Sequence, residues 1–456
     1  MDVQNVNRIY FIGIGGIGMS ALARYYHSKN ATVSGYDKTP SALTLQMEDS
    51  GIRIHYEDNV ALLDKNAQLV VYTPAVPKDH SELNYYLHNN YTVIKRSALL
   101  GEITKPAFNI CIAGTHGKTT ISTLVAHILR DSGFGCNAFL GGISVNYNTN
   151  FWSSNNNVSV AEADEYDRSF LQLSPNLAVI SAMDADHLDI YGTKENMEDA
   201  FVQFAERLRA KGTIFINYNL PDNKFSSVHH KRYSRSNDKA DVFAENIQLS
   251  GGGYTFDIMS NDWSIENVQL NMGGLHNIEN AVAAISIAHE LNIDPEKIKK
   301  AVSSFKGVKR RFEYIIAPSG SDKVVFIDDY AHHPQELEAL ISGAKNLFPE
   351  KKCTVIFQPH LFSRTRDLAD DFAKALSLAD EVVLLPVYPA RELPVPGVSS
   401  RMIAEKMNDK PVTVCTKDEF LRNINDKKNS IELLITAGAG DIDQLVLPVK
   451  EILMSK

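Results

Sequence analysis

Short apolar runs alternate along the chain with longer stretches in which apolar residues return every three or four positions. Residues 8–12 form the first run, and a helical pattern follows as far as residue 29. Each run is short enough to be a buried strand, and the stretches between the runs are long enough to be covering helices. Because this alternation persists through the chain, the sequence predicts an α/β protein built on parallel sheets.

The other predicted strands end at residue 37, open the stretch 108–130, and span 67–72, 92–95, 157–161, 176–182, 323–327, 353–357, 381–385 and 432–436. Between them, polar turn formers over 146–157 predict an exposed connection. A chain of 456 residues accommodates two to four domains at roughly 100–200 residues each. We place three domains at 1–106, 107–311 and 312–456, with Pro106 ending the first.

The stretch 108–130 has the layout of a phosphate cradle: a buried strand, a loop that ends in Lys118, Thr119 and Thr120, and an apolar-periodic helix. Backbone N–H groups from Thr115 to Thr119 can converge on phosphate oxygens at the helix N-terminus. Lys118 would neutralise β- and γ-phosphate oxygens, and Thr119 can hold Mg²⁺. We therefore predict a nucleoside triphosphate site, since an ordinary strand-to-helix turn does not explain the Lys-Thr placement. Ile112 stands where the common P-loop has glycine.

A second glycine-rich loop follows the first strand. Gly13, Gly15, Gly16 and Gly18 satisfy G-x-G-x-x-G, and the predicted strand after the next helix ends at Asp37. This arrangement suits the diphosphate of a nucleotide conjugate. We favour a UDP-type ligand over NAD and over a purely structural turn. A loop that begins at Thr73, at the carboxyl end of another predicted strand, is placed where open α/β sheets bind ligands.

Two acidic clusters, 162–167 and 184–189, also follow predicted strands. Carboxylate oxygens are the ligands that Mg²⁺ prefers, and an imidazole can join or orient them. Singly, each cluster suits a solvated loop; beside a phosphate loop, the pair favours a metal–nucleotide site. Asn277 and Asn280 can face one ligand from a helix's first turn or cap that helix. The basic run that ends at Arg311 suits a phosphate clamp or a surface patch.

In the last block, four successive strands end in loops that carry polar and charged residues, at 328–334, 358–367, 386–392 and 437–441. Because the carboxyl ends of parallel strands meet at one edge of a sheet, this edge is predicted to be a binding face. Single histidines or arginines in such loops are more often structural, but the whole set favours function.

Composition narrows the classes of function. The chain is 44% hydrophobic and 22% charged with a net charge of −9, which describes an acidic globular protein and argues against nucleic-acid binding. The four cysteines are far apart, so neither a disulfide framework nor a zinc site is predicted. Without a signal peptide or a long apolar run, we expect a cytoplasmic protein with no membrane insertion.

Nine motifs together resemble the Mur ligases, and most of all their alanine-adding branch: GIGGIGMSALA, AGTHGKTT, EADEYD, DADHLDIYG, GLHNIENA, KRRFE, DDYAHHPQE, FQPHLFSRTRDL and GAGD. The resemblance covers essentially the whole chain. It implies a Rossmann-like N-terminal domain for UDP-N-acetylmuramate, a P-loop-type central ATPase domain, and a Rossmann-like C-terminal domain that closes over the nucleotide and supports L-alanine. ATP and Mg²⁺ are the implied cofactors.

The resemblance also implies roles for individual residues. For ATP, it assigns to the phosphates Gly114, Thr115, His116, Gly117, Lys118, Thr119 and Thr120, to the adenine Asn277 and Asn280, and to the phosphates and ribose Arg311, Asp329 and His332. For Mg²⁺, it assigns Thr119, Glu162 and His187. For the substrates, it assigns to the UDP-sugar Gly15, Gly16, Gly18, Asp37 and Thr73, and to the alanine carboxylate His360, Arg364 and Arg366. Lys118 and His187 are the implied catalytic residues. No lysine lies between Lys194 and Lys211, which agrees with the alanine-adding branch, since other branches place a carbamylated lysine there.

The implied reaction forms an acyl phosphate on the muramate carboxylate, which the amine of alanine then attacks. His187 or a histidine of the last domain could be the base. Three other hypotheses stay open: a murein tripeptide ligase that uses the same sugar nucleotide, an NAD-dependent oxidoreductase, and a nucleotide-binding switch without catalysis. A monomer and a homodimer are equally compatible with the sequence.

Overall fold

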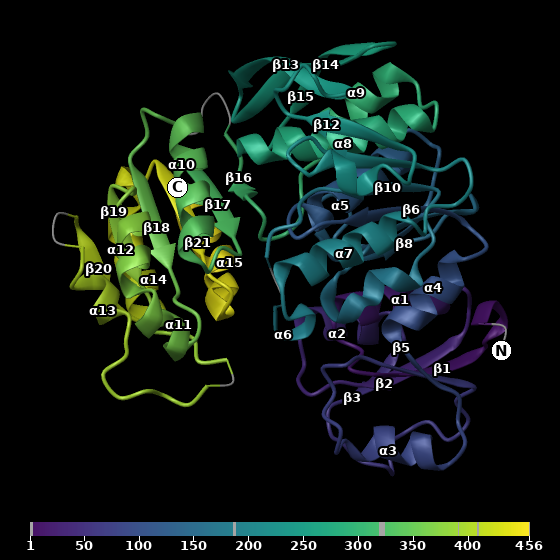
Figure 1. Ribbon diagram of the computed structural model, residues 1–456. Helices are drawn as coiled ribbons and strands as arrows, with labels where there is room; N and C mark the ends of the chain where they lie inside the picture. Colours follow the sequence, from purple (N-terminus) through teal and green to yellow (C-terminus); the bar gives the residue numbers. More distant parts are fainter. Residues whose placement is uncertain (1–2, 186–187, 319–323, 391, 408–409, 456) are drawn as a thin grey trace. The chain divides into compact units, whose positions relative to one another are not determined.

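The structure, a computed structural model, describes residues 3–185, 188–318, 324–390, 392–407 and 410–455 (Figure 1). The chain forms two compact units. One comprises residues 1–245, 257–266 and 279–302, and the other comprises 246–256, 267–278 and 303–456. Among the described residues the strands form three sheets of five, ten and six strands.

The first sheet is fully parallel and has the strand order β3-β2-β1-β4-β5. Its strands are β1 (Arg8–Ile12), β2 (Thr32–Tyr36), β3 (Arg53–His55), β4 (Leu69–Tyr72) and β5 (Val93–Lys95). The helices of this part are η1 (Val3–Asn5), α1 (Ile17–Ser28), α2 (Ala42–Asp49), α3 (Ser81–His88) and α4 (Arg96–Thr104). The strand order reverses between β1 and β4, and ligands of open α/β sheets bind at such a reversal. The glycine-rich loop after β1 lies there.

The second sheet has the order β15-β14-β13-β12-β11-β10-β6-β9-β7-β8. Its strands are β6 (Phe108–Ala113), β7 (Asn137–Ser144), β8 (Thr149–Trp152), β9 (Val158–Glu162), β10 (Leu177–Ile180), β11 (Thr213–Asn217), β12 (His230–Ser234), β13 (Val242–Ser250), β14 (Gly253–Ser260) and β15 (Ser264–Leu270). The accompanying helices are α5 (Lys118–Asp131), η2 (Tyr166–Gln172), α6 (Leu188–Tyr191), α7 (Lys194–Ala205), η3 (Asp222–Phe225), α8 (Leu275–Glu290) and α9 (Pro295–Ser304). β6 lies between β10 and β9, so the loops after these three strands meet at one edge.

The predicted exposed connection over 146–157 is wrong. Its middle forms β8, which pairs antiparallel with β7 at the edge of the sheet and buries Phe151 and Trp152. Asn150 is fully buried, and its side-chain amide donates to the backbone oxygen of Ile17 and to the Ser20 hydroxyl, at 2.6 and 2.9 Å. This polar segment therefore packs on α1 of the first sheet, and a hydrogen-bonded asparagine replaces the apolar residue that a buried position normally carries.

The third sheet has the order β16-β17-β21-β18-β19-β20, and only β16 pairs antiparallel. Its strands are β16 (Glu313–Ile316), β17 (Val325–Asp329), β18 (Cys353–Phe357), β19 (Glu381–Leu384), β20 (Val412–Val414) and β21 (Leu433–Ala437). The helices are α10 (Pro334–Leu347), α11 (Phe362–Asp367), α12 (Ala369–Leu376), α13 (Arg401–Ala404), α14 (Lys417–Lys427), η4 (Lys428–Ser430), η5 (Asp441–Leu445) and α15 (Val446–Met454). Two apolar clusters form the core of this part.

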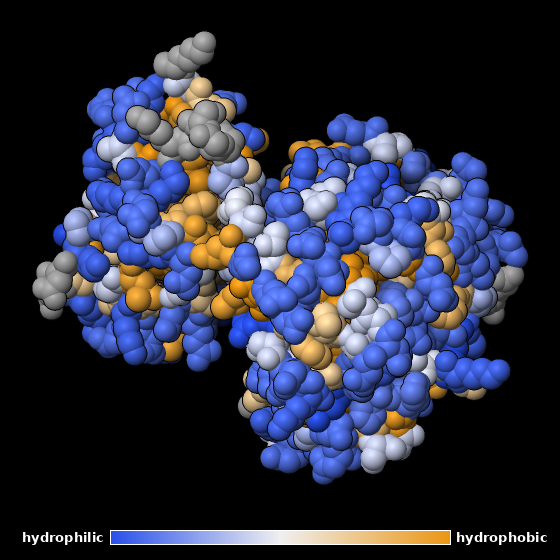
Figure 2. Space-filling view, turned by 90° about the horizontal axis from the view of Figure 1, so that it is seen from above, coloured by the Kyte–Doolittle hydropathy of each residue, from blue (hydrophilic) through white to orange (hydrophobic). Residues whose placement is uncertain are grey.

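The predicted α/β class, with three sheet-bearing parts rich in parallel pairing, is confirmed. The boundaries 1–106, 107–311 and 312–456 stay predictions. Hydrophilic residues cover most of the face drawn in Figure 2, with apolar patches between them. None of the helices in the described ranges is long and apolar enough to cross a membrane.

Gly101, inside α4, generates a prediction about the packing of this helix. A Cβ at Gly101 would lie 2.6 Å from the backbone oxygen of Gln172 in η2. Alanine normally stabilises a helix interior by about 1 kcal/mol over glycine, but the overpacking here costs about 1–3 kcal/mol. We therefore expect Gly101→Ala to lower the melting temperature. Gly343→Ala in α10 is the control, because the nearest atom to its Cβ would be 3.8 Å away. If both variants were equally stabilised, this account of the packing would be wrong.

Candidate active site

Two glycines shape the loop between β6 and α5. Gly114 has a φ of 128°, and a Cβ there would collide with the Ser181 side chain. Gly117 precedes the first residue of α5 with a φ of 81°, and a Cβ there would lie 2.7 Å from Oδ1 of Asn280. Both backbone conformations are ones that side chains rarely permit, so these positions need glycine. The loop ends at the N-terminus of a helix, where an anion is stabilised.

Lys118 is held by an ion pair that the sequence alone does not reveal. Its Nζ lies 2.7 Å from each carboxylate oxygen of Glu165 and 2.7 Å from the backbone oxygen of Gly114. The Lys118 side chain is 14% exposed and that of Glu165 only 1%. An ammonium has three protons, and each of the three has an acceptor here. A phosphate oxygen that binds Lys118 must therefore replace or share one of these partners.

The loop is also fastened to the end of β10. The Thr115 N–H donates to the backbone oxygen of Ala182 at 3.0 Å, and the Ser181 hydroxyl donates to the backbone oxygen of His116. In this structure the Thr115 N–H therefore serves the loop itself, and a contact of Thr115 with phosphate stays a prediction. The exposed His116 ring lies 3.5 Å from Asp184. These bonds fix the loop that delivers Lys118 and Thr119.

Glu162, the last residue of β9, lies beside Thr119. The Thr119 side chain favours the ionised form of its carboxylate, and the Gly141 N–H donates to Oε2 at 3.1 Å. Burial raises the pKa of Glu162, whereas the charge of Lys118 and these donors lower it. A divalent cation would favour the ionised form, so the hydroxyl and the carboxylate fit Mg²⁺ chemically. His187 and its neighbour Asp186 lie outside the described residues, and within those residues no group of three His, Cys, Asp or Glu side chains could hold a metal.

The glycine-rich loop after β1 is hydrogen-bonded to Asp37, the acidic residue that follows β2. The Gly15 N–H donates to Oδ2 of Asp37 at 2.7 Å, and the Lys38 N–H donates to Oδ1 at 2.8 Å. Gly13 has a φ of 85°, and a Cβ there would lie 2.9 Å from the Thr73 side chain. The structure therefore brings Asp37 and Thr73 to this loop, as a shared site requires. Gly16 precedes α1, whose N-terminus faces the same region.

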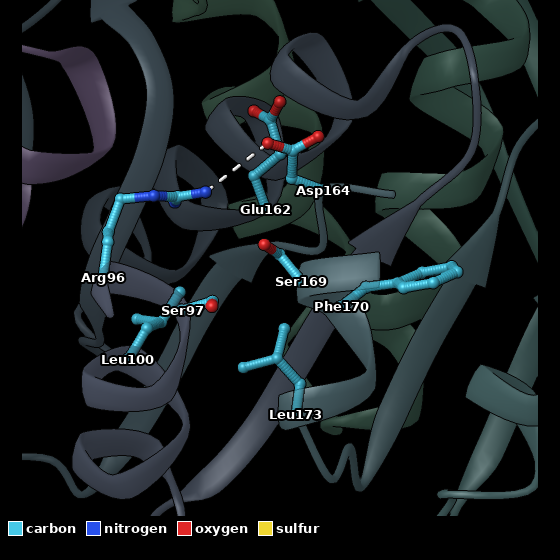
Figure 3. Close-up of a pocket in the computed structure, with 8 residues that line it drawn as sticks. All are labelled: Arg96, Ser97, Leu100, Glu162, Asp164, Ser169, Phe170 and Leu173. Carbon is cyan, nitrogen blue, oxygen red and sulfur yellow. Dashed lines mark ion pairs between the residues drawn. The ribbon is translucent and has the colours of Figure 1, made fainter. Parts of the chain in front are cut away.

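Arg96, which carries no recognisable motif, joins the two loop systems. It is the first residue of α4, and its Nη2 lies 3.5 Å from Oδ2 of Asp164. Figure 3 shows Arg96 extended toward Asp164, with Glu162 beside it, in a pocket whose lining also includes Ser97, Leu100, Ser169, Phe170 and Leu173. The one available signal is positional, because Arg96 directly follows the strand predicted at 92–95.

Asn277 and Asn280 lie inside α8, two and five residues after its first residue, so neither is the N-cap. Both side chains are buried. The Asn277 amide donates to the backbone oxygen of Gly273 at 2.7 Å, and Asn280 faces Gly117 of the phosphate loop. Asn280 is thus placed against the nucleotide loop, whereas the role of either residue at an adenine stays a prediction.

Asp328 and Asp329 end β17 in the unit that carries the third sheet. Asp329 accepts hydrogen bonds from the N–H groups of Phe312 and Ala331, each at 2.7 Å. Asp328 accepts one from the Thr436 hydroxyl at 2.6 Å, and burial raises its pKa to about 7. Burial also raises the pKa of Asp329, while the nearby charge of Arg311 lowers it.

The two arginines of the basic run differ. Arg310 lies 3.5 Å from Asp328, packs over the Tyr330 ring at 5.0 Å, and donates to the backbone oxygen of Gly438. Arg310 therefore braces this unit internally. Arg311 is exposed, which leaves its guanidinium accessible to a ligand.

The predicted residues for the amino acid fall into two groups. The rings of His332 and His360 lie 6.0 Å apart, and His360 stacks on Tyr388 at 5.8 Å. Burial lowers the pKa of His332, and the charge of Arg364 lowers it further, so Arg364 belongs to the same cluster. Arg366 instead pairs with Asp367 at 2.7 Å, with both side chains more than half exposed. Its predicted role at the carboxylate has no support from this geometry.

Comparison with known families places the chain. Residues 8–107 match the family model described as "Mur ligase family, catalytic domain", residues 112–288 match "Mur ligase middle domain", and residues 310–446 match "Mur ligase, glutamate ligase domain". The fold and the two glycine-rich loops describe a nucleotide-binding α/β protein with several sheets. The chain belongs to the Mur ligase family.

Individual relatives agree with this assignment. A curated UDP-N-acetylmuramate–L-alanine ligase from Parabacteroides distasonis is 48% identical over 99% of this chain and 98% of its own length. The crystal structure of UDP-N-acetylmuramate-alanine ligase from Thermotoga maritima is 28% identical with a TM-score of 0.82, covering 97% of this chain and 98% of that one. A murein peptide ligase from Psychrobacter arcticus has a TM-score of 0.67 at 23% identity, covering 98% and 99%.

The buried pair of Lys118 and Glu165 generates a prediction about stability. Lys118→Met keeps most of the side chain but leaves the buried Glu165 carboxylate without its counter-ion. Removing one partner of a buried pair costs about 3–5 kcal/mol. We expect Lys118→Met to lose about 3 kcal/mol in urea unfolding, and Lys118→Met with Glu165→Gln to recover most of it. If the double variant is as unstable as the single one, the pair does not act as a unit.

The raised pKa of Asp328 predicts a pH dependence. Its pKa is 3.8 ordinarily and about 7 in the fold, so the folded form holds more protons between these values. Raising the pH from about 4 to 7 therefore destabilises the fold, by up to about 4 kcal/mol from this group. Asp328→Asn keeps an acceptor for Thr436 and stays neutral. We expect its melting temperature to exceed that of the wild type by clearly more at pH 8 than at pH 5, because the wild type loses most of this contribution between the two pH values. An equal difference at both pH values would contradict the assignment.

Proposed function

We propose that this chain is an ATP-dependent ligase that joins L-alanine to the carboxylate of UDP-N-acetylmuramate, a step of peptidoglycan precursor synthesis. The observation that carries the proposal is the fixed phosphate loop, with Lys118 and Thr119 beside Glu162, in the same compact unit as the glycine-rich loop. The relatives that bear this name support the choice, because they align along nearly the full chain.

The reaction follows from the chemistry of these groups. A muramate carboxylate oxygen attacks the γ-phosphorus of ATP, the bond to the β,γ-bridging oxygen breaks, and ADP leaves. The product is an acyl phosphate. The amine of L-alanine, after losing a proton, attacks the acyl carbon, and inorganic phosphate leaves as the amide forms. Lys118 stabilises the charge that spreads over the γ-phosphate oxygens.

Thr119 and Glu162 would hold Mg²⁺, with His187 as a proposed third ligand and, with Lys118, a proposed catalytic residue. When bound, the ion supplies positive charge to the phosphates. Gly114 to Thr120, Asn277, Asn280, Arg311, Asp329 and His332 are the proposed contacts for ATP. Gly15, Gly16, Gly18, Asp37 and Thr73 are those for the UDP-sugar.

His332, His360 and Arg364 cluster in one unit, which supports His360 and Arg364 as the proposed contacts for the alanine carboxylate. An arginine can bind a carboxylate with two parallel hydrogen bonds. We retain Arg366 only as a more distant candidate, since it pairs with Asp367. The base that deprotonates the alanine ammonium is His187 or one of these histidines.

The alternatives have less support. The murein peptide ligase is less similar in structure than the alanine ligase, with TM-scores of 0.67 and 0.82. A nicotinamide enzyme is not supported, because residues 8–107, which contain the glycine-rich loop, match the Mur ligase family model. We further propose a cytoplasmic enzyme, as a monomer or homodimer, that binds neither membrane nor nucleic acid.

Phosphate release tests the proposal. We expect release only when ATP, Mg²⁺, UDP-N-acetylmuramate and L-alanine are all present, since attack on ATP needs the sugar carboxylate and release needs the amine. A tripeptide that replaces L-alanine and supports equal turnover would favour the recycling ligase. Lys118→Met is the control, with turnover lost but sugar-nucleotide binding nearly intact. Phosphate release that ignores the sugar nucleotide would refute the proposal.

A further inference from the structure

Two ion pairs connect the start of α4 with the segment that follows β9. Lys95 lies 3.2 Å from Asp167, and Arg96 lies 3.5 Å from Asp164. The pairs differ in their surroundings, because the Lys95 side chain is 49% exposed and that of Arg96 is 21% exposed. Of the four residues in these two pairs, Arg96 and Asp164 line the pocket that Glu162 also lines, and Lys95 and Asp167 do not (Figure 3). Arg96 therefore faces the site, whereas Lys95 faces solvent.

Arg96 also packs against the glycine-rich loop's helix. A Cβ at Gly18 would lie 2.7 Å from Nη1 of Arg96, 3.2 Å from Cδ and 3.3 Å from Cζ. Gly18 is the second residue of α1, next to the loop that is proposed for the diphosphate. The missing side chain at Gly18 thus makes room for the guanidinium. The Nη1 side of the Arg96 guanidinium thus lies at Gly18, and its Nη2 side lies at Asp164.

The ion pair with Asp164 stabilises the fold too little to explain by itself why an arginine stands at position 96. It is long at 3.5 Å, and the Asp164 side chain is 37% exposed. Such pairs contribute about 0–1 kcal/mol. Asp164 also accepts the Tyr166 N–H at 3.1 Å, so part of its charge is already neutralised locally. A guanidinium has five donors in a planar fork and can bind an incoming anion in two parallel bonds.

We propose that Arg96 binds an anionic oxygen group of the sugar nucleotide, its diphosphate or its carboxylate, and that Asp164 holds the guanidinium in place before the ligand arrives. This inference rests on the proposed function. The carboxylate must approach a triphosphate, and two anions repel each other. A cation that lies between the glycine-rich loop and Glu162 offsets this repulsion where the reacting groups must meet.

Calorimetric titration of the full chain with UDP-N-acetylmuramate, without ATP, tests the inference directly. We expect Arg96→Gln to weaken binding about tenfold or more, as the loss of charge-assisted hydrogen bonds predicts. Arg96→Lys should retain part of the affinity, because it keeps the charge but loses the fork. Lys95→Gln is the matched control, since it breaks the neighbouring ion pair, and its affinity should stay within about twofold of the wild type.

A second ligand distinguishes the two anionic groups. UDP-N-acetylglucosamine carries the diphosphate but lacks the carboxylate. If Arg96→Gln weakens both ligands equally, Arg96 contacts the diphosphate; if it weakens only the muramate, Arg96 contacts the carboxylate. Either result supports the inference. The ATP affinity and the melting temperature of Arg96→Gln should match those of the wild type. If Arg96 had only a structural role, the substitution would change them.

Gly18→Ala provides an independent variant, because its methyl group would displace the guanidinium. If both substitutions act through Arg96, the variant with Gly18→Ala and Arg96→Gln should bind UDP-N-acetylmuramate no more weakly than the weaker single variant. Wild-type affinity of Arg96→Gln for both ligands would overturn the inference and leave the proposed function standing. A wild-type protein that does not bind the sugar nucleotide would instead refute the proposed function.

Discussion

The buried ion pair between Lys118 and Glu165 is the constraint on which the phosphate loop depends. It aligns the ammonium with the start of α5, and the Glu165 side chain, at 1% exposure, has Lys118 as its buried counter-ion. The same pair limits how ATP binds, since all three ammonium protons already have acceptors within 2.7 Å. A triphosphate must compete with a carboxylate for this lysine. The pair of Lys118 and Glu165 therefore influences both the conformation of the phosphate loop and its affinity for the nucleotide.

Around this pair, the acidic segment after β9 serves several partners. Glu162 lies with Thr119, Asp164 with Arg96, and Glu165 with Lys118. The segment thus holds two cationic side chains, Arg96 and Lys118, each beside a different ligand loop. Each of them can exchange its carboxylate partner for an anionic substrate. Because phosphoryl transfer between two anions needs concentrated positive charge, this arrangement suits the reaction better than an isolated phosphate loop would. The close approach of Arg96 to α1 explains why Gly18 carries no side chain.

The sequence predicts most strands and the phosphate loop because both are local: strand runs are contiguous, and Gly114 to Thr120 are adjacent. It misplaces 146–157 because a polar composition hides a strand whose buried Asn150 donates its side-chain amide to α1, far away in sequence. Glu165 and Arg96 are missed for the same reason, since their partners lie dozens of residues away. Arg366 shows the opposite error, where a motif assigns a role to a side chain that pairs with its own neighbour. Local residue spacing thus predicts the loops, whereas the partners of their side chains are known only from the folded structure.

The central claim is that ATP activates the sugar carboxylate itself, and not the amino acid or water. An oxygen isotope measures this directly. UDP-N-acetylmuramate labelled with heavy oxygen in its carboxylate is turned over with ATP and L-alanine, and the released phosphate is analysed by mass spectrometry. The account predicts one heavy oxygen in each phosphate released from doubly labelled carboxylate, because the bond between carbon and oxygen breaks when the amine attacks. Phosphate without label, formed at the same rate as the amide, would contradict it.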